Sequence, residues 1–430
     1  MNPQAKILND LIAKQSPVLF SLLSQKGKEI FFPKKGILAQ SADAKGKKIN
    51  ATIGTAIEDD GSPMRLESIS KNTTLPPQQV FPYAPSFGTT ELRQVWQKAI
   101  FQKNPSLLNK NISLPVATQA LTHGLSIVGY LFVDAQDEIL LPDYFWGNYN
   151  LIFNNAYGAI LETYPTFEGN FLNLSGLEQG LKKGKIGKKI ILLNFPNNPT
   201  GYTPTIKEVK KIVKIIKNSA KQGNRLVIII DDAYFGLVYE KGIEKESIFA
   251  RLANLHENVL AIKIDGPTKE DYVWGLRVGF ITFGIKNGQR ELYETLEQKT
   301  AGVIRGSVSN ISNLSQSLLL NAYQSPSYEE EKAKKYQLLK KRYQTVKKVL
   351  QNEKYQEYFD ALPFNSGYFM CIKLKNNLDG EAVRQLLLKE YDTGIIDLAG
   401  VLRIAFSAVK ENDILPLFEN IYNACKKLNN

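Results

Sequence analysis

The chain has few of the residues that build disulfide or metal frameworks. Its 430 residues include two cysteines, Cys371 and Cys425, and two histidines, His123 and His256. Two cysteines cannot make a disulfide framework, and neither residue type shows the spacing of a zinc site. The sequence therefore predicts no metal, and so little cysteine is typical of a protein from a reducing compartment.

Long apolar runs are also missing. No stretch approaches the length of apolar sequence that a bilayer span needs. Residues 1–23 alternate polar and apolar side chains at helical spacing, which differs from the unbroken apolar core of a signal peptide. These features predict a cytoplasmic protein without a membrane segment.

The motifs of several enzyme classes are absent. There is no Gly-x-Ser-x-Gly nucleophile elbow and no Walker-type phosphate loop. The net charge of +12 comes largely from lysines spread over predicted helices, as in residues 329–348. Nucleic-acid modules interleave basic and aromatic residues on one face. That pattern is not found, so we interpret the charge as a solvated surface and predict no nucleic-acid partner.

Short apolar runs alternate with helical patterns from residue 89 onward. Several runs are continuous and rich in β-branched residues, such as Leu226 to Ile230, which is typical of parallel strands buried on both faces. Strands are predicted at residues 138–141, 159–163, 189–194, 225–231, 259–264 and 278–283. Helices are predicted at residues 91–101, 124–132 and 206–221. The sequence thus predicts an α/β fold with a mostly parallel sheet covered by helices.

A different pattern follows Ser325. A long charged helix is predicted at residues 328–352, then strands at 368–374 and 402–406 and helices at 380–391 and 411–428. We therefore expect a large domain over residues 61–325 and a smaller α/β domain over 326–430. Residues 1–60 are expected to form an N-terminal arm that packs with the small domain.

Polar residues lie at the carboxyl ends of the predicted strands, where open parallel sheets bind their ligands. Residues 194–201 read Asn-Phe-Pro-Asn-Asn-Pro-Thr-Gly, Asp231-Asp232-Ala233-Tyr234 ends the next strand, and Lys269 and Arg277 follow a third. Taken alone, a lysine after a strand is usually solvated, Asn-Pro-Thr-Gly is more often a turn, and an arginine beside a strand is normally structural. An aspartate at a strand end is a helix cap about as often as a site residue. Their order and spacing together resemble the class I/II pyridoxal-phosphate-dependent aminotransferases of fold type I, closest to the aspartate and aromatic branch. The resemblance covers roughly residues 49–407.

The resemblance implies how the cofactor, pyridoxal 5′-phosphate, would be held. Lys269 would form a Schiff base with its aldehyde and later carry the α-proton. Asp231 would keep the pyridine nitrogen protonated. Asn198 and Tyr234 would hydrogen-bond the phenolic oxygen, and Trp146 would stack on the ring.

The phosphate and the substrate would have their own ligands by the same resemblance. Arg277, Thr268 and the backbone N–H groups of Gly124 and Leu125 at a helix N-terminus would bind the phosphate. Arg403, with Gly54 and Asn198 beside it, would bind the substrate carboxylate. Tyr83 would reach the phosphate of a second subunit and Arg305 the distal carboxylate of aspartate or glutamate, which implies a homodimer with shared active sites.

Two positions depart from the family pattern. Gly266 stands where many relatives have a phosphate-binding hydroxyl, so Thr268, Ser126 or a backbone amide are the candidates to replace it. Tyr149 stands where the aspartate branch has a histidine behind the ring-pairing aspartate. The hypothesis is transfer of an amino group from an L-amino acid to a 2-oxo acid. The alternatives are another reaction of this fold, such as β-elimination or decarboxylation, and a non-catalytic regulator.

Overall fold

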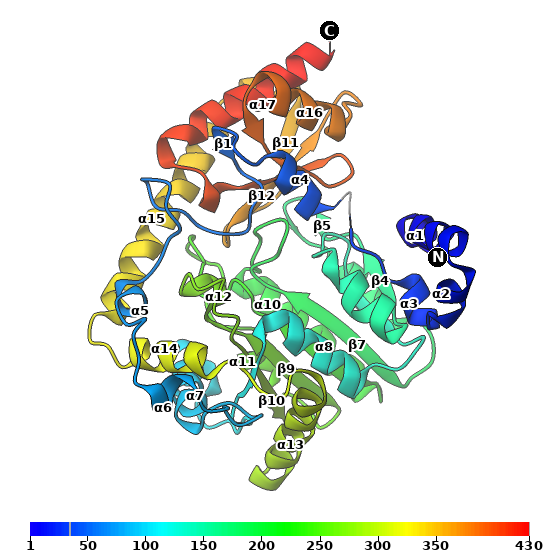
Figure 1. Cartoon of the computed structure of the whole chain (residues 1–430), viewed down its shortest axis with the longest axis vertical. Coiled ribbons are helices and arrows are strands. Elements are labelled where there is room, and N and C mark those ends of the chain that lie inside the picture. Colours follow the sequence, from blue (N-terminus) through cyan, green and yellow to red (C-terminus); the bar gives the residue numbers. More distant parts are fainter. Residues whose placement is uncertain (34–35, 430) are drawn as a thin grey trace.

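The computed structural model describes residues 1–33 and 36–429 and has a larger and a smaller α/β part (Figure 1). The larger part is built on a seven-stranded sheet in the order β2-β10-β9-β8-β7-β3-β4. Strand β10 runs antiparallel to β2 and β9, and the other pairs are parallel. The mostly parallel sheet predicted from the sequence is therefore confirmed. The strands are β2 (Val116–Thr118), β3 (Glu138–Pro142), β4 (Ile160–Tyr164), β7 (Lys188–Asn194), β8 (Arg225–Asp231), β9 (Val259–Asp265) and β10 (Gly279–Ile285).

The register of the central strands places their carboxyl ends side by side. Asn194 of β7 lies opposite Asp231 of β8, and Asp231 lies opposite Ile264 of β9. The apolar residues of these strands are buried, as expected for strands covered on both faces. Polar side chains at the strand ends thus share one edge of the sheet, where open α/β sheets bind ligands.

Helices surround the sheet, and their ends follow local signals. Helix α10 (Ile206–Lys221) begins with a capping box in which Thr205 and Glu208 satisfy each other's backbone N–H groups. Helix α8 begins at Ala120, four residues before the predicted start at Gly124. The other helices of this part are α5 (Glu67–Ser70), α6 (Pro77–Val80), α7 (Thr90–Lys103), α9 (Leu174–Lys182), α11 (Phe249–Leu252), α12 (Pro267–Glu270), α13 (Arg290–Ser307) and α14 (Asn313–Tyr323), with α8 spanning Ala120–Phe132.

The smaller part contains an antiparallel sheet of four strands in the order β11-β12-β15-β14. Helix α15 (Tyr328–Val349) runs from the larger part to the smaller one (Figure 1). The domain boundary near residue 325 stays a prediction. The remaining elements here are β11 (Phe359–Ala361), β12 (Phe369–Leu374), β13 (Thr393–Gly394), β14 (Ile396–Asp397), β15 (Val401–Ala405), α16 (Gly380–Glu390) and α17 (Ile414–Asn429).

The N-terminal segment contacts both parts rather than the smaller one alone. Strand β1 (Ile49–Asn50) pairs in parallel with β13, and α4 (Ile37–Asp43) lies beside the same part. The first three helices lie instead against the larger part (Figure 1), where Lys26 Nζ donates to the Ala156 carbonyl at 2.7 Å. These helices are α1 (Pro3–Gln15), α2 (Pro17–Leu22) and α3 (Gln25–Glu29). No helix within residues 1–33 and 36–429 has the length and hydropathy to cross a membrane.

Candidate active site

A cavity of about 1540 Å³ opens at the carboxyl edge of the central strands, below the smaller part. It brings together residues that lie far apart in the sequence. Nine of the predicted site residues line it: Gly54, Trp146, Asn198, Asp231, Tyr234, Thr268, Lys269, Arg277 and Arg403. Four predicted residues do not line it in the described chain: Tyr83, Gly124, Leu125 and Arg305.

Lys269 projects its amine into this cavity from the short helix α12. Its Nζ donates to the Gly54 carbonyl at 3.0 Å and lies 5.2 Å from the centre of the Tyr234 ring. Burial and the nearby charges of Arg277 and Arg403 lower the pKa of the amine to about 8, although Asp231 opposes them. About a tenth of this amine is therefore neutral at pH 7, far more than for an ordinary lysine, and the neutral form is the nucleophile and proton acceptor.

Asp231 ends β8 with its carboxylate buried. One oxygen accepts from Tyr149 Oη at 2.6 Å and the other from the Ala233 N–H at 3.1 Å. Burial raises the pKa of this carboxyl to about 6, and these two hydrogen bonds oppose the rise. An acidic group held in an apolar site binds a cationic partner strongly, because the pair replaces lost solvation. Tyr149 thus lies behind Asp231, as the sequence implied.

Arg403 enters from β15 of the smaller part and is only 2% exposed. Its two terminal nitrogens donate to Asn198 Oδ1 at 3.2 Å and to the Thr52 carbonyl at 2.8 Å. Its guanidinium carbon lies 4.4 Å from the centre of the Phe369 ring. Asn198 is held in turn, because its N–H donates to Asn194 Oδ1 at 2.8 Å. A buried guanidinium without a carboxylate partner among these contacts is suited to an anionic ligand.

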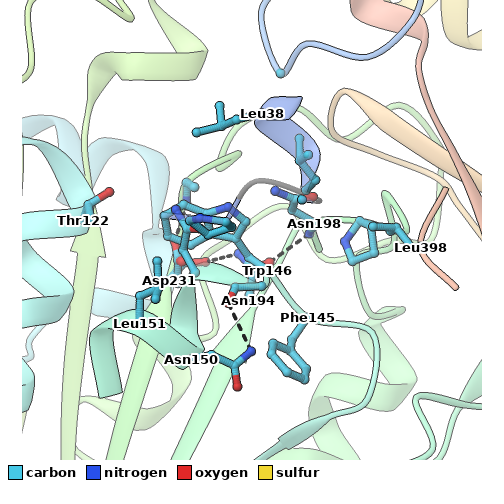
Figure 2. A pocket seen from close by; sticks show the side chains of 18 of the residues that line it. Leu38, Thr122, Phe145, Trp146, Asn150, Leu151, Asn194, Asn198, Asp231 and Leu398 are labelled. Carbon is cyan, nitrogen blue, oxygen red and sulfur yellow. Dashed lines mark hydrogen bonds between the residues drawn. The ribbon is translucent and has the colours of Figure 1, made fainter. Parts of the chain in front are cut away.

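Aromatic residues cover the Asp231 side of the cavity. Figure 2 shows Trp146 lying among Asp231, Asn194 and Asn198, with Phe145 nearby. The Trp146 ring also meets the Tyr149 ring edge-on, with centres 5.6 Å apart. An indole face beside a buried carboxylate can hold a flat heteroaromatic ring by stacking.

Gly124 and Leu125 do not lie at the start of the helix, where the sequence places them, and they do not line the cavity. Both residues lie inside α8, and a Cβ on Gly124 would come within 3.0 Å of Ile264 Cγ2 on β9. The helix begins at Ala120, whose φ of 57° turns the chain into it, so Ala120, Leu121 and Thr122 line the cavity instead. The free N–H groups of a helix lie in its first turn, which is here four residues earlier.

Gly266 lacks a side chain because there is no room for one. A Cβ at this position would lie 2.9 Å from both Gly279 Cα and the Val278 carbonyl oxygen. The neighbouring Thr268 is 5% exposed, and its Oγ1 has no hydrogen-bond partner among the described residues. Thr268 also lines the cavity. This unpaired hydroxyl is therefore placed to take over the role that Gly266 cannot fill.

Tyr83 and Arg305 lie on a shared outer surface. Tyr83 is 92% exposed, and Arg305, also exposed, donates to Ser309 Oγ at 2.7 Å. The two segments touch, because Ser86 Oγ donates to the Ser309 carbonyl at 2.8 Å. Neither side chain reaches the cavity of its own chain.

Sequence reasoning missed two groups that line the cavity. Trp274 does so with a buried Nε1 that has no partner among the described residues. Met1, Phe32 and Leu38 come from the N-terminal segment, and Figure 2 shows Leu38 above the site. Trp274 could have been noticed, since it lies between Lys269 and Arg277. The N-terminal residues carry no local signal.

The comparisons with known proteins identify the family. Residues 48–421 match the family "Aminotransferase class I and II". The chain belongs to this family. It is 24% identical to the cytoplasmic aspartate aminotransferase of Oryza sativa subsp. japonica over 64% of this chain and 66% of that one. It is 27% identical to an aspartate aminotransferase of Bacillus sp. (strain YM-2) over 59% of each. These alignments span less than two thirds of the relatives' own length.

Solved structures share the fold over nearly the whole chain. The aminotransferase of Anaerococcus prevotii superposes with a TM-score of 0.83 at 22% identity, covering 94% of this chain and 99% of that one. The Pyrococcus horikoshii kynurenine aminotransferase in complex with PMP gives 0.78 at 16% identity, covering 95% and 98%. The chain therefore has the α/β architecture called fold type I among pyridoxal-phosphate-dependent enzymes.

The family implies pyridoxal phosphate as the cofactor, and the residues of this cavity fit it. A buried carboxylate at Asp231 suits a protonated ring nitrogen, and Trp146 suits the ring face. Thr268 Oγ1 and Trp274 Nε1 are buried donors without protein acceptors, which phosphate oxygens would satisfy. Arg277 lines the same cavity, and its planar guanidinium is suited to a phosphate.

Replacing Thr268 with valine is expected to weaken pyridoxal phosphate binding roughly tenfold, because a charge-assisted hydrogen bond is lost. The apoprotein should keep or gain stability, since valine removes a buried hydroxyl without a partner. Absorbance titration and thermal unfolding measure the two effects. Thr282→Val is the matched control, because Thr282 Oγ1 is also buried and unpaired but lies away from the cavity. Equal affinity in both variants would exclude Thr268 as a ligand.

Proposed function

We propose that this protein is a pyridoxal-phosphate-dependent aminotransferase that moves the amino group of an L-amino acid to a 2-oxo acid. The observation that carries the proposal is the convergence of Lys269, Asp231 and Arg403 in one cavity. A partly neutral amine, a buried carboxylate and a buried guanidinium are the three groups that this chemistry needs from a protein. Membership of the aminotransferase family supports it.

The bound cofactor would supply an aldehyde for the amino group and an electron-withdrawing ring. Asp231 would hold a proton on the ring nitrogen, which keeps the ring cationic. The neutral amine of Lys269 would take the proton from the substrate α-carbon and would later give it to the cofactor carbon. Tyr234, 4% exposed and beside that amine, would donate a hydrogen bond from its hydroxyl to the phenolic oxygen of the ring.

Arg403 would bind the substrate α-carboxylate through its two terminal nitrogens. Both already point at acceptors, Asn198 Oδ1 and the Thr52 carbonyl, so the guanidinium plane is fixed before substrate arrives. A fixed plane orients the α-hydrogen toward Lys269, and orientation of this kind lowers the barrier. Gly54 leaves this approach open, since a Cβ there would lie 3.1 Å from Phe369 Cζ and 3.7 Å from Lys269 Nζ.

A homodimer with shared active sites is part of the proposal. Tyr83 and Arg305 lie on one surface and do not reach their own cavity. The same surface lies near the start of α8, because His123 contacts Ser307 Oγ at 3.0 Å. His123 Nδ1 accepts from the Gln119 N–H and so caps that helix.

The cytoplasmic location of the protein stays a prediction.

We propose glutamate or aspartate as the favoured amino donor, with Arg305 of a second copy binding the distal carboxylate. Arg305→Ala should lower kcat/KM for L-glutamate roughly 30- to 100-fold, because a charged hydrogen-bonded contact is lost. The value for L-alanine should change little. Lys299→Ala, on the same helix and exposed, is the control. Equal losses for both amino acids would reject the assignment.

Transamination is tested against other reactions of this fold by its products. An aminotransferase converts the amino acid to its 2-oxo acid and leaves the amino group on the acceptor. A β-lyase releases ammonia, and a decarboxylase releases carbon dioxide. Incubation of the loaded protein with L-glutamate or L-aspartate and a 2-oxo acid should yield equal amounts of new amino acid and new 2-oxo acid. Release of ammonia or carbon dioxide instead would reject the proposed reaction.

A further inference from the structure

The three residues from Lys269 to Asp271 are tethered by several other elements. The Lys269 carbonyl accepts from Tyr368 Oη at 2.6 Å. Asp271 is fully buried and accepts from Tyr328 Oη at 2.7 Å and Tyr323 Oη at 3.0 Å. These contacts fix the segment that carries the amine without touching the amine itself.

Two lysines neutralise the two carboxylates of this segment. Lys103 Nζ of α7 lies 2.9 Å from Glu270. Lys332 Nζ of α15 lies 2.8 Å from Glu270 and 2.9 Å from Asp271. Burial raises the pKa of Glu270, yet Lys103 and Lys332 lower it to about 2. Glu270 is therefore charged, and the burial of both acidic side chains depends on the neighbouring lysines.

Of these two lysines, Lys332 lies on α15, the helix that joins the larger and the smaller part. Its neighbour Glu331 accepts from Ser68 N–H at 2.9 Å on the larger part. Farther along α15, Arg342 Nη1 donates to the Ser407 carbonyl at 2.8 Å on the smaller part. Ser407 follows β15, the strand that carries Arg403. Figure 1 shows α15 spanning both parts along one side.

We infer that Lys332 is a positioning residue. It holds the segment that carries Lys269 in a fixed position relative to α15, the helix that also contacts Ser407 just after the strand of Arg403. The inference rests on the proposed function. Lys332 bridges Glu270, the last residue of α12, and Asp271, which follows it, so the end of α12 is tied to α15 at one point. A misplacement of about 1 Å at the reacting group is enough to slow catalysis strongly. Lys332 therefore acts through geometry, by holding the two residues that follow Lys269.

Lys332→Met tests this role with Lys334→Met as the matched control. Lys334 lies on the same helix but pairs with Glu330 at the surface, where both side chains are 70% exposed. With L-glutamate as donor, Lys332→Met should lower kcat roughly 10- to 100-fold. KM should change less than about threefold, because the carboxylate contact of Arg403 is kept. Lys332→Arg should recover most of kcat.

Hydrogen exchange of the apoproteins gives a readout that does not depend on turnover. The Asp271 and Val273 N–H groups donate to the Pro267 and Thr268 carbonyls in the native fold. Exchange over residues 267–276 should be faster in Lys332→Met and unchanged in Lys334→Met. A folded Lys332→Met protein with wild-type kcat, or with wild-type exchange in this segment, overturns the inference.

A second variant covers the case in which Lys332→Met does not fold. Tyr328→Phe removes one hydroxyl that donates to Asp271 and keeps the ion pairs of Lys332 with Glu270 and Asp271. It should give the same two effects at smaller size, and their absence overturns the inference. Failure of the proposed function is a separate result. A wild-type protein that converts no tested amino acid rejects that function, and the exchange data alone then decide the role of Lys332.

Discussion

Replacing Lys269 with alanine is expected to lower kcat by about four orders of magnitude, because one side chain provides both the covalent attachment and the proton transfer. Lys269→Arg should be as inactive as Lys269→Ala, since a guanidinium keeps the positive charge but does not give up its proton. The pair of variants thus separates the charge of the residue from its proton transfer. Steady-state kinetics with L-glutamate and a 2-oxo acid measures both.

The same lysine predicts a pH dependence for cofactor binding. The pKa of its amine is lowered to about 8, and the neutral form is the nucleophile. The rate at which the apoprotein captures pyridoxal phosphate should therefore rise with pH and level off above about 8. Stopped-flow absorbance measures it. A rate that still rises steeply near pH 10 would contradict the lowered pKa, and activity in Lys269→Ala near that of the wild type would contradict the role.

Asp231→Asn is expected to lower kcat roughly 100- to 1,000-fold, because the ring nitrogen loses the carboxylate that keeps it protonated. Asparagine keeps the shape of the side chain and can still accept from Tyr149 Oη. Asp232→Asn is the neighbouring control. Asp232 pairs with Lys263 and accepts from Ser247 Oγ behind the site, so its loss should affect stability more than kcat. Equal kcat losses would contradict the assignment.

The buried carboxylate of Asp231 should also lower the free energy of unfolding of the apoprotein at neutral pH. Burial raises its pKa from 3.8 to about 6, so the folded state binds this proton more tightly than the unfolded state. Stability from this group is present below about pH 4 and is lost as the pH rises through about 6. A shift of two units corresponds to about 3 kcal/mol at neutral pH. The apo form of Asp231→Asn should thus unfold at higher temperature than the wild type at about pH 8, with a smaller difference at about pH 5.

The sequence predicted those parts of the site that depend on strand ends. Asp231 ends β8, and Asn198 and Lys269 come shortly after the neighbouring strands β7 and β9, so parallel pairing brings their positions to one edge. Arg403 came from the family resemblance, because nothing local distinguishes it from another strand arginine. The lack of a side chain at Gly266 was visible in the sequence, but its cause, the approach of Gly279 and Val278, is a tertiary contact.

The errors arose at helix starts and in the N-terminal segment. The sequence pattern predicts the start of α8 at Gly124, whereas the chain enters the helix at Ala120 with a positive φ, a conformation that favours glycine. The helical spacing over residues 1–23 does not form one helix, because Ser16 ends α1 and, with Pro17, starts α2. The contact of Lys26 with Ala156 spans 130 residues, and no local pattern encodes it.

The most direct test of the central claim is the visible absorbance spectrum of the purified, cofactor-loaded protein before and after adding L-glutamate. We expect the long-wavelength band of bound pyridoxal phosphate to disappear with L-glutamate and to return when a 2-oxo acid is added. The Lys269→Ala protein should show no such cycle. A wild-type protein that stays colourless after incubation with pyridoxal phosphate would contradict the account of Lys269 and its cavity.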